Sequence, residues 1–478
     1  MSGIFLDYFV IVAYLAIITF IGLFFSGKKE SVNDFFLGGR NVKWWAVALS
    51  ILAAETSTLT FISIPGLAYK TNLNFLQITI GYLIGRIIVA KYLLPLYYKD
   101  KLSTAYSFLE LRFGNKTKIS ASVIFMFTRV AADGVRLFAT AIPLKYLLGI
   151  DYIYAIMIIG SISLIYSSFG GIRGIILIDV VQMIVYILGA LIAFNLIVSS
   201  EAVNGISNLL HVAAENEKLS IFNFEMATSL SEFFGKPYTL IASLIGGIFL
   251  SMASHGTDQF IVQRLLTIKK LKDAQKAIIS SGVLVVFQFF LFLMVGIALY
   301  VFYGNLDLKP DEIFPMFIVD EISPGLSGFL IAGVLAAAMS SLAGSISALS
   351  SSTVYDILPI FRLNIKDEKT VSIIISIFWS IVLVISAMLF IEMPRSVVEI
   401  ALGIASFTYG GLLGTFLLGI LNKKANETQA LISFSFGILG MAILISLSLV
   451  AWTWFTFIGV GITLSTGYLL TAFAGSKD

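Results

Sequence analysis

The chain has 478 residues, of which 58% are hydrophobic and only 12% are charged, and its mean hydropathy is +0.97. A soluble protein carries about 25% charged residues, so this composition excludes an ordinary soluble globular protein. The chain contains no cysteine, which excludes disulfides, thiolate metal sites and cysteine nucleophiles. The net charge of +3 gives no indication of a nucleic-acid partner, and we expect none.

Apolar runs of about 20 residues recur along the chain, and each is long enough to cross a ~30 Å hydrocarbon core as a helix. Such runs indicate helices, because backbone within a bilayer must satisfy its own hydrogen bonds. The N-terminus MSGIFLDYFV lacks a basic n-region, so we expect a retained helix there and not a signal peptide. The sequence predicts an all-α polytopic membrane protein with about 13 transmembrane helices, at 6–25, 44–68, 74–97, 119–148, 152–169, 174–198, 238–263, 276–303, 325–357, 370–390, 396–421, 429–448 and 451–472.

The connections between these spans alternate in charge. Those after odd-numbered spans are rich in Lys and Arg, as in 99–118 and 264–276, whereas the others carry few basic residues. By the positive-inside rule, the N-terminus lies outside and the C-terminus in the cytoplasm of a cell membrane. The one long connection, 199–237, lies on the outer side and is expected to be partly structured. We therefore expect a single membrane-embedded domain over residues 1–478, with the lipid bilayer as its surroundings.

The second span contains polar groups at membrane depth, in the stretch SILAAETSTLTFISIPG. Polar groups there are costly, so each is a candidate for function. One interpretation is that the hydroxyls bond to their own helix and that the carboxylate pairs with an arginine. The presence of a carboxylate together with several hydroxyls favours a binding site instead. The candidates are Glu55, Thr56, Ser57, Thr58 and Thr60.

Two further spans carry candidate ligands for a cation. In the ninth span, the adjacent Ser340 and Ser341 could supply two hydroxyl oxygens to a hard cation. The alternative for this span is close helix packing through small residues. In the sixth span, Asp179 stands in an apolar run, and its alternative role is a snorkelling or arginine-paired carboxylate.

The fourth span holds Arg129, Asp133 and Arg136. Arg129 and Asp133 are spaced i, i+4 and can pair with each other, which leaves Arg136 as a candidate partner for an anion. In the seventh span, His255 is a candidate ligand, although a lone buried histidine is more often structural. The chain has no HExxH, P-loop or GxSxG motif, so we expect no enzymatic activity.

Together these segments resemble the sodium:solute symporter family, which includes sodium-coupled proline, sugar, sialic acid, pantothenate and iodide transporters. The resemblance covers nearly the whole chain and rests on NDFFLGGRNVKWWAVALS, GVRLFAT, FGGIRGIILIDVVQ, GTDQFIVQR and AAAMSSL. It implies a LeuT-like fold, in which two inverted repeats of five helices follow one extra helix and precede two others. The repeats would be 44–198 and 238–421, with 1–43 and 422–478 peripheral. The first helix of each repeat would be broken in the middle of the membrane.

The resemblance also implies a site for the coupling ion, Na⁺. Some relatives have a second sodium site at the counterpart of Asp179, but this chain has Ala343 and Gly344 where further serines would contribute. We therefore expect one firm sodium site, with Asp179 as the candidate for a second. The implied ligands of the first site are the carbonyls of Ala53, Thr56 and Ala337 and the hydroxyls of Ser340 and Ser341.

For the solute, the resemblance implies that Arg136 matches an arginine that contacts a substrate carboxylate in sialic acid transporters. Glu55 would lie beside the cation, at a position where sodium-coupled relatives often carry Asp or Asn. The other implied residues of the solute site are Ser57, Thr58, Thr60, Phe75 and Thr79, with His255 as a further candidate.

We therefore expect a secondary-active sodium-coupled symporter that imports a small carboxylate or amino acid by alternating access. The alternatives are a sodium-coupled sugar or polyol transporter, a channel or sensor on the same scaffold, or an integral membrane enzyme. The spans that would bind a sugar are apolar here, as in VLVVFQFF, which disfavours that alternative. No obligatory protein partner is expected.

Overall fold

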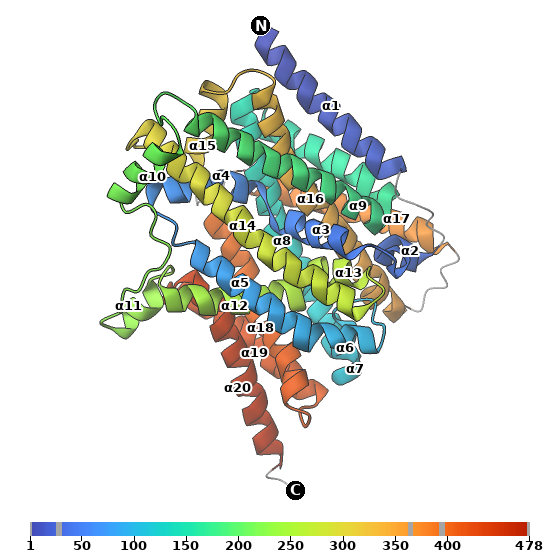
Figure 1. The fold of residues 1–478 in the computed structure, drawn as a ribbon. Helices are drawn as coiled ribbons and strands as arrows, with labels where there is room; N and C mark the ends of the chain where they lie inside the picture. Colours follow the sequence, from blue (N-terminus) through green and yellow to red (C-terminus); the bar gives the residue numbers. More distant parts are fainter. Residues whose placement is uncertain (1, 25–30, 362–366, 392–396, 476–478) are drawn as a thin grey trace.

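The computed structural model describes residues 2–24, 31–361, 367–391 and 397–475, and these residues form helices and connecting loops with no strand among them (Figure 1). The first ten helices are α1 (Ser2–Phe24), α2 (Val32–Leu37), α3 (Trp44–Glu55), α4 (Thr58–Lys70), α5 (Leu76–Ile88), α6 (Leu94–Lys99), α7 (Ser107–Arg112), α8 (Asn115–Leu148), α9 (Tyr152–Val198) and α10 (Ile206–Glu215). The others are α11 (Leu230–Gly235), α12 (Leu240–Gly256), α13 (Gln259–Leu266), α14 (Leu271–Tyr303), α15 (Pro310–Asp320), α16 (Leu326–Ser352), α17 (Glu368–Leu389), α18 (Val397–Leu421), α19 (Glu427–Ser446) and α20 (Phe455–Gly475).

Short irregular helical segments complete this set. Two π-helical segments, Val89–Leu93 and Thr353–Ile357, continue α5 and α16. Turns of 3-10 helix occupy Gly38–Arg40, Leu358–Phe361 and Trp452–Trp454. The connection 199–237 contains α10 and α11, so the expectation that it is partly structured is confirmed.

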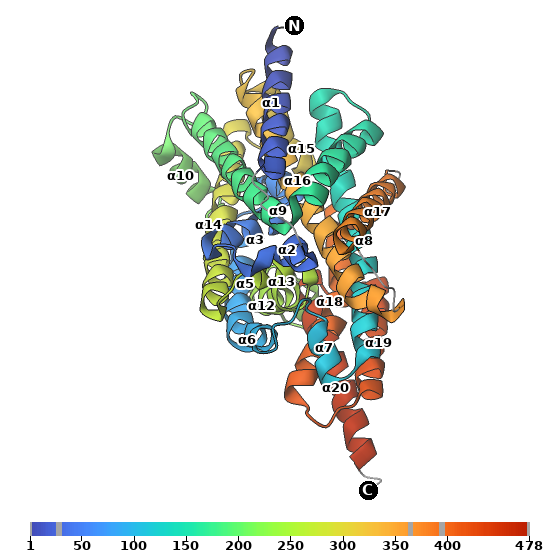
Figure 2. The same ribbon diagram turned by 90° about the vertical axis from the view of Figure 1, so that its right-hand side faces the viewer.

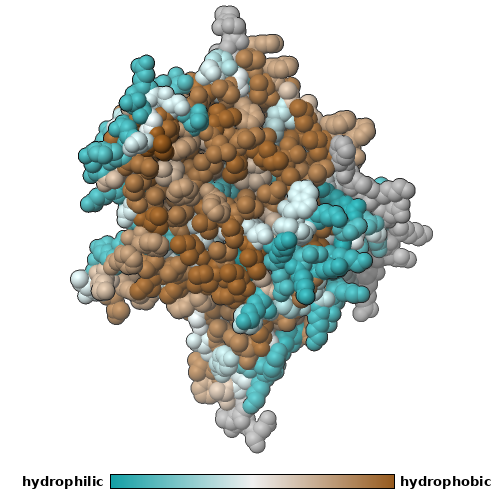
Figure 3. All heavy atoms as spheres, viewed as in Figure 1, coloured by the Kyte–Doolittle hydropathy of each residue, from teal (hydrophilic) through white to brown (hydrophobic). Residues whose placement is uncertain are grey.

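The surface matches a membrane environment. A broad hydrophobic area separates two hydrophilic areas, one near α10 and one near α6 and α13 (Figure 3). Large apolar side chains are exposed on the long helices: Phe127 of α8 and Phe287 of α14 are 72% and 66% exposed. Eight helices in the described ranges are long and apolar enough to cross a membrane, or up to ten if each bent pair counts as one span. The predicted all-α membrane fold is therefore confirmed, whereas the count of 13 spans stays a prediction.

Two of the predicted spans are broken. Helices α3 and α4 meet at an angle of 63° across Thr56 and Ser57, and α12 and α13 meet at 59° across Thr257 and Asp258. Side chains replace the lost backbone bonds at these breaks: for example, the Asp258 carboxylate accepts a hydrogen bond from the Phe260 amide at 2.9 Å. These breaks confirm the expectation for the first helix of each proposed repeat.

Helix α16 forms the centre of the molecule. All its residues from Leu330 to Ser352 are buried, and α16 packs along α9, α8 and α1. Its alanines, glycines and serines let these neighbours approach closely. Helix α9 joins two predicted spans through Gly171, whose φ of 57° and ψ of −173° turn the chain sharply. Helices α19 and α20 lie at the end of the molecule opposite to the start of α1 (Figure 2).

Candidate functional site

The break between α3 and α4 leaves backbone carbonyls free at membrane depth. The last backbone bond of α3 runs from the Thr56 amide to the Leu52 carbonyl at 3.0 Å, and the Phe61 amide bonds to the Ser57 carbonyl at 3.2 Å. The carbonyls of residues 53–56 fall between these bonds and have no partner within either helix. Such carbonyls are suitable oxygen ligands for a cation.

A small cavity of about 160 Å³ opens directly beside this break. We call it the small cavity. Four of the five implied sodium ligands line it together: Ala53 of α3, Thr56 at the break, and Ala337 and Ser340 of α16. The remaining wall comes largely from α9. Its lining residues are Ala53, Thr56, Gln182, Met183, Tyr186, Ala336, Ala337 and Ser340.

The Asp179 carboxylate lies behind the small cavity and is fully buried. It accepts hydrogen bonds from the hydroxyls of Ser50 and Ser340, the latter at 2.6 Å, and it pairs with the Arg264 guanidinium at 3.2 Å. Because the Ser340 hydroxyl donates its hydrogen bond to Asp179, its lone pairs remain available to a cation. Gly344 makes room for the guanidinium, since a Cβ at this position would collide with Arg264.

Asp179 therefore has its positive partner within the chain, which corresponds to the arginine-paired alternative for this residue. A second cation would have to share the carboxylate with Arg264. The number of sodium sites stays a prediction.

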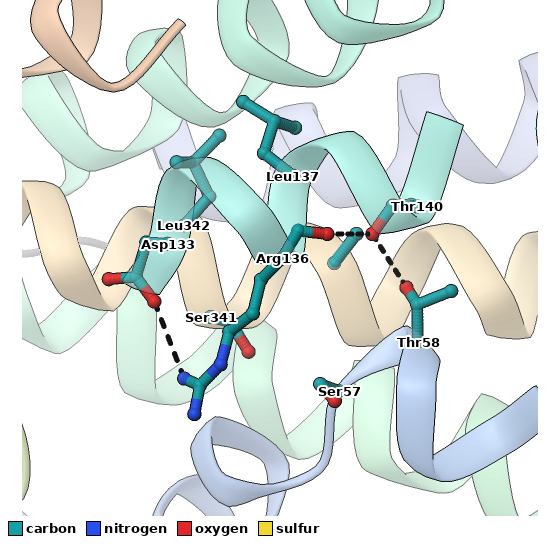
Figure 4. Close-up of a pocket in the computed structure, with 9 residues that line it drawn as sticks. Ser57, Thr58, Asp133, Arg136, Leu137, Thr140, Ser341 and Leu342 are labelled. Atoms are coloured by element: carbon teal, nitrogen blue, oxygen red, sulfur yellow. Dashed lines mark hydrogen bonds and ion pairs between the residues drawn. The ribbon is translucent and has the colours of Figure 1, made fainter. Parts of the chain in front are cut away.

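A larger cavity, of about 270 Å³, lies on the other side of the break. We call it the arginine cavity. Helices α8, α4 and α16 enclose it, and the Arg136 side chain extends into it from α8 towards Ser57 and Ser341 (Figure 4). Its lining residues are Ser57, Thr58, Asp133, Arg136, Leu137, Thr140, Ala338, Ser341 and Leu342.

Hydrogen bonds tie the wall of the arginine cavity together. The Thr140 hydroxyl bonds to the Arg136 carbonyl at 2.9 Å and to the Thr58 hydroxyl at 2.8 Å, which joins α8 to α4. The Thr58 hydroxyl lies 3.3 Å from the Val334 carbonyl of α16. Ser341 also faces α3, because its hydroxyl lies 3.4 Å from the Ala54 carbonyl. Ser340 and Ser341 thus line two different cavities from neighbouring positions of one helix.

The Arg136 guanidinium is only partly satisfied by the protein. In the described ranges it makes one side-chain hydrogen bond, to Asp133 at 3.3 Å, and its side chain is 28% exposed. Asp133 is shared, since the Arg129 guanidinium lies 3.6 Å from its other oxygen. The predicted pairing of Arg129 with Asp133 is therefore present, but Arg129 contacts Asp258 more closely.

The remaining candidates lie outside both cavities. Glu55 pairs with the fully buried Arg86 of α5, and the His255 ring lies 3.8 Å from the same carboxylate. Phe75 stacks on Phe289 with 5.2 Å between ring centroids. The structure places two other hydroxyls against the backbone: Thr60 accepts a bond from the Ser57 amide at 3.4 Å, and Thr79 donates to the Leu76 carbonyl at 2.7 Å.

Several buried polar residues near these cavities were not singled out from the sequence. They are Arg86, Gln182, Arg264 and Gln288. Arg86 is a charged residue within an apolar span, so the rule applied to Arg136 would have found it. The two glutamines carry no charge and are less conspicuous in a sequence.

Comparison with known proteins decides the family of this chain. The sequence profile of the sodium:solute symporter family matches residues 35–437. The chain belongs to this family. The symporter is 30% identical over 453 residues to the sodium/sialic acid symporter SiaT of Proteus mirabilis (strain HI4320), a match that covers 91% of this chain and 89% of that protein.

Two further matches agree. The symporter is 28% identical over 449 residues to sodium-coupled monocarboxylate transporter 2 of Bos taurus, covering 91% of this chain and 71% of that protein. It also matches a solved structure of a substrate-bound, outward-open sodium-coupled sialic acid symporter that reveals a novel sodium site. The TM-score is 0.88 at 26% identity, and 98% of each chain is covered. The LeuT-like fold, sodium coupling and a transport rather than enzymatic role are therefore confirmed for this multi-pass membrane protein.

The contact between Glu55 and Arg86 yields a prediction that separates a structural role from a solute-binding role. Glu55→Gln leaves a buried guanidinium without its carboxylate, which costs about 3–5 kcal/mol for a buried pair. We expect a clearly lower thermal midpoint of the purified symporter in detergent, and partial recovery when Arg86→Gln is added. A normal midpoint combined with a changed apparent affinity for the solute would instead assign Glu55 to solute binding.

Proposed function

We propose that this symporter imports a small carboxylate-bearing solute together with Na⁺, and that Arg136 binds the carboxylate. The observation that carries this proposal is the incomplete satisfaction of Arg136 in the arginine cavity. A guanidinium has five N–H donors, and here one of them bonds to Asp133. A carboxylate can accept two parallel bonds from such a group.

The electrostatics of the cavity support an anionic partner. Placing an arginine within a membrane span costs at least ~2.5 kcal/mol, so its charge needs compensation. Asp133 supplies only part of it, because Arg129 draws on the same carboxylate at 3.6 Å. The neighbouring hydroxyls of Ser57, Thr58 and Ser341 can bond to other polar atoms of the solute.

The relatives favour the same chemical class. Their names give sialic acid and monocarboxylates as solutes, and both classes carry a carboxylate. A sugar or polyol would leave the guanidinium without a charged partner. An amino acid offers the same carboxylate and is the second candidate. Uptake of a solute panel into proteoliposomes, with and without a sodium gradient, tests this assignment.

We place the sodium ion at the boundary between the two cavities. Its ligands are the carbonyls of Ala53, Thr56 and Ala337 and the hydroxyls of Ser340 and Ser341. All five are oxygen donors, which hard cations prefer. An ion bound there would stabilise the packing of α16 against the break between α3 and α4. Since Ala338, Ser341 and Leu342 form one wall of the arginine cavity, ion binding shapes the solute site.

Several broader features belong to the same proposal. The repeats 44–198 and 238–421 would move relative to each other during alternating access, with 1–43 and 422–478 peripheral. The charged connections support an N-terminus outside and a C-terminus in the cytoplasm of the cell membrane. Transport would require no obligatory protein partner and no nucleic acid.

The proposed sodium site predicts the effect of removing both hydroxyls. Ser340→Ala with Ser341→Ala should raise the sodium concentration for half-maximal uptake by about tenfold or more, because two charge-dipole contacts are lost. Ser345→Ala is the matched control, since Ser345 is buried on the same helix and lines neither cavity. Unchanged sodium dependence in the double variant would contradict the site.

A second prediction concerns the planar fork of Arg136. Arg136→Lys keeps the positive charge but loses the bidentate contact, so the apparent affinity for the solute should weaken by about one to two orders of magnitude. Arg112→Lys serves as control, since Arg112 donates to carbonyls near the end of α18, away from both cavities. If Arg136→Lys lowers stability but leaves affinity unchanged, Arg136 pairs only within the protein.

A third prediction follows from charge balance. With one sodium ion per turnover, a monocarboxylate moves no net charge, so an imposed membrane potential should not change its accumulation. A zwitterionic amino acid would move one positive charge, and 100 mV would then add about 2.3 kcal/mol, or roughly fifty-fold accumulation. Potential-driven uptake of a monoanion, measured with valinomycin and a potassium gradient, would show that more than one sodium ion moves per turnover.

A further inference from the structure

The Gln182 side chain has an unusual position in the wall of the small cavity. It is 1% exposed, and neither its amide oxygen nor its amide nitrogen has a hydrogen-bond partner in the described ranges. Gln182 lies on α9, one helical turn after Asp179, and therefore on the same face of that helix. It faces the cavity together with Ala53, Thr56, Ala337 and Ser340.

A buried amide without partners is costly. Leaving such a group unsatisfied costs about 1–3 kcal/mol, and most buried polar atoms in folded proteins have a partner. A nearby glutamine follows that rule: the Gln288 amide exchanges bonds with the Thr56 hydroxyl at 2.7 Å and 3.0 Å. The absence of a partner therefore distinguishes Gln182, which lines the small cavity, from Gln288.

Two neighbouring hydroxyls offer alternative partners within the chain. The hydroxyls of Tyr14 on α1 and Tyr166 on α9 are buried and lie close enough to interact with the Gln182 amide. Tyr166 already donates to the Met339 carbonyl at 2.6 Å, so it can only accept a bond from the amide nitrogen. The amide oxygen could accept one bond from Tyr14, and its second lone pair would remain available to an ion.

We propose that the amide oxygen of Gln182 is a further ligand of the coupling ion. This inference rests on the proposed sodium site and adds a sixth oxygen to its five donors. Carboxamide oxygens are good ligands for hard cations. Because the amide is neutral, it strengthens the site without adding negative charge, and Asp179 is already balanced by Arg264. A site without net negative charge favours a monovalent ion over a divalent one.

The test measures ion binding at equilibrium on the full-length symporter in detergent. The thermal midpoint is followed during titration with NaCl at constant ionic strength, and separately with CaCl₂. Gln182→Leu should raise the sodium concentration for half-maximal stabilisation by about tenfold, because an ion-dipole contact is lost. Gln182→Glu adds a charge to the site, so it should create a stabilisation by Ca²⁺ that the unmodified symporter lacks.

Two control variants should keep the original sodium dependence. Tyr14→Phe removes the alternative partner of the amide oxygen. Ser243→Ala removes a buried hydroxyl that also lacks a partner among the described residues but lies on α12 outside both cavities. If Tyr14→Phe shifts the sodium dependence as much as Gln182→Leu, the amide acts by contacting Tyr14, and the proposal is overturned.

The remaining outcomes distinguish this inference from the sodium site itself. If Ser340→Ala with Ser341→Ala shifts the sodium dependence but Gln182→Leu does not, only the role of Gln182 is wrong. If neither variant shifts it, the sodium site is wrong as well. Should Gln182→Leu fail to fold, Gln182→Glu decides, since unchanged sodium dependence without a calcium response would also overturn the proposal.

Discussion

The need to satisfy every polar group within the membrane is the constraint on which this structure depends. An unpaired charge or a free backbone group is costly in hydrocarbon, because no water is available to compensate it. The buried arginines accordingly lie against carboxylates: Arg86 against Glu55, Arg129 against Asp258, and Arg264 against Asp179. These pairs join helices that are distant in sequence, and they leave few polar groups available for a ligand.

The groups that remain available define where transport chemistry can occur. The break at Thr56 and Ser57 exposes carbonyls on one side of α16, and the partly satisfied Arg136 faces its other side. Because Ser340 and Ser341 reach both sides from adjacent positions, the ion and the solute would share one structural element in the proposed assignment. Coupling between them would then require no long pathway, since each ligand would stabilise the same arrangement of α16 against α3 and α4.

Asp179 and Gln182 illustrate how neighbouring polar residues on one helix can take different roles. Its carboxylate is neutralised by Arg264, and it orients the Ser340 hydroxyl instead of facing the cavity itself. Gln182, one turn along the same helix, carries no charge and lines the cavity without a hydrogen-bond partner in the part of the chain that the structure describes. The electrostatic character of the small cavity therefore depends on neutral oxygen donors, with the charged groups one layer behind them.

The sequence by itself determined the membrane class and the helical character, because hydropathy is a local property. It also marked Arg136 as a candidate, because a charged residue within an apolar run is conspicuous. The broken spans and the four residues that line the small cavity were implied by the resemblance to the symporter family. The tertiary structure decided the partners. Asp179 and Ser340 are 161 positions apart, and Arg86 and Glu55 are 31 apart, so no local pattern could pair them. The tertiary structure likewise placed Glu55 beside Arg86 and His255, and it left Gln182 without a hydrogen-bond partner among the described residues, because which polar groups meet depends on how the helices pack.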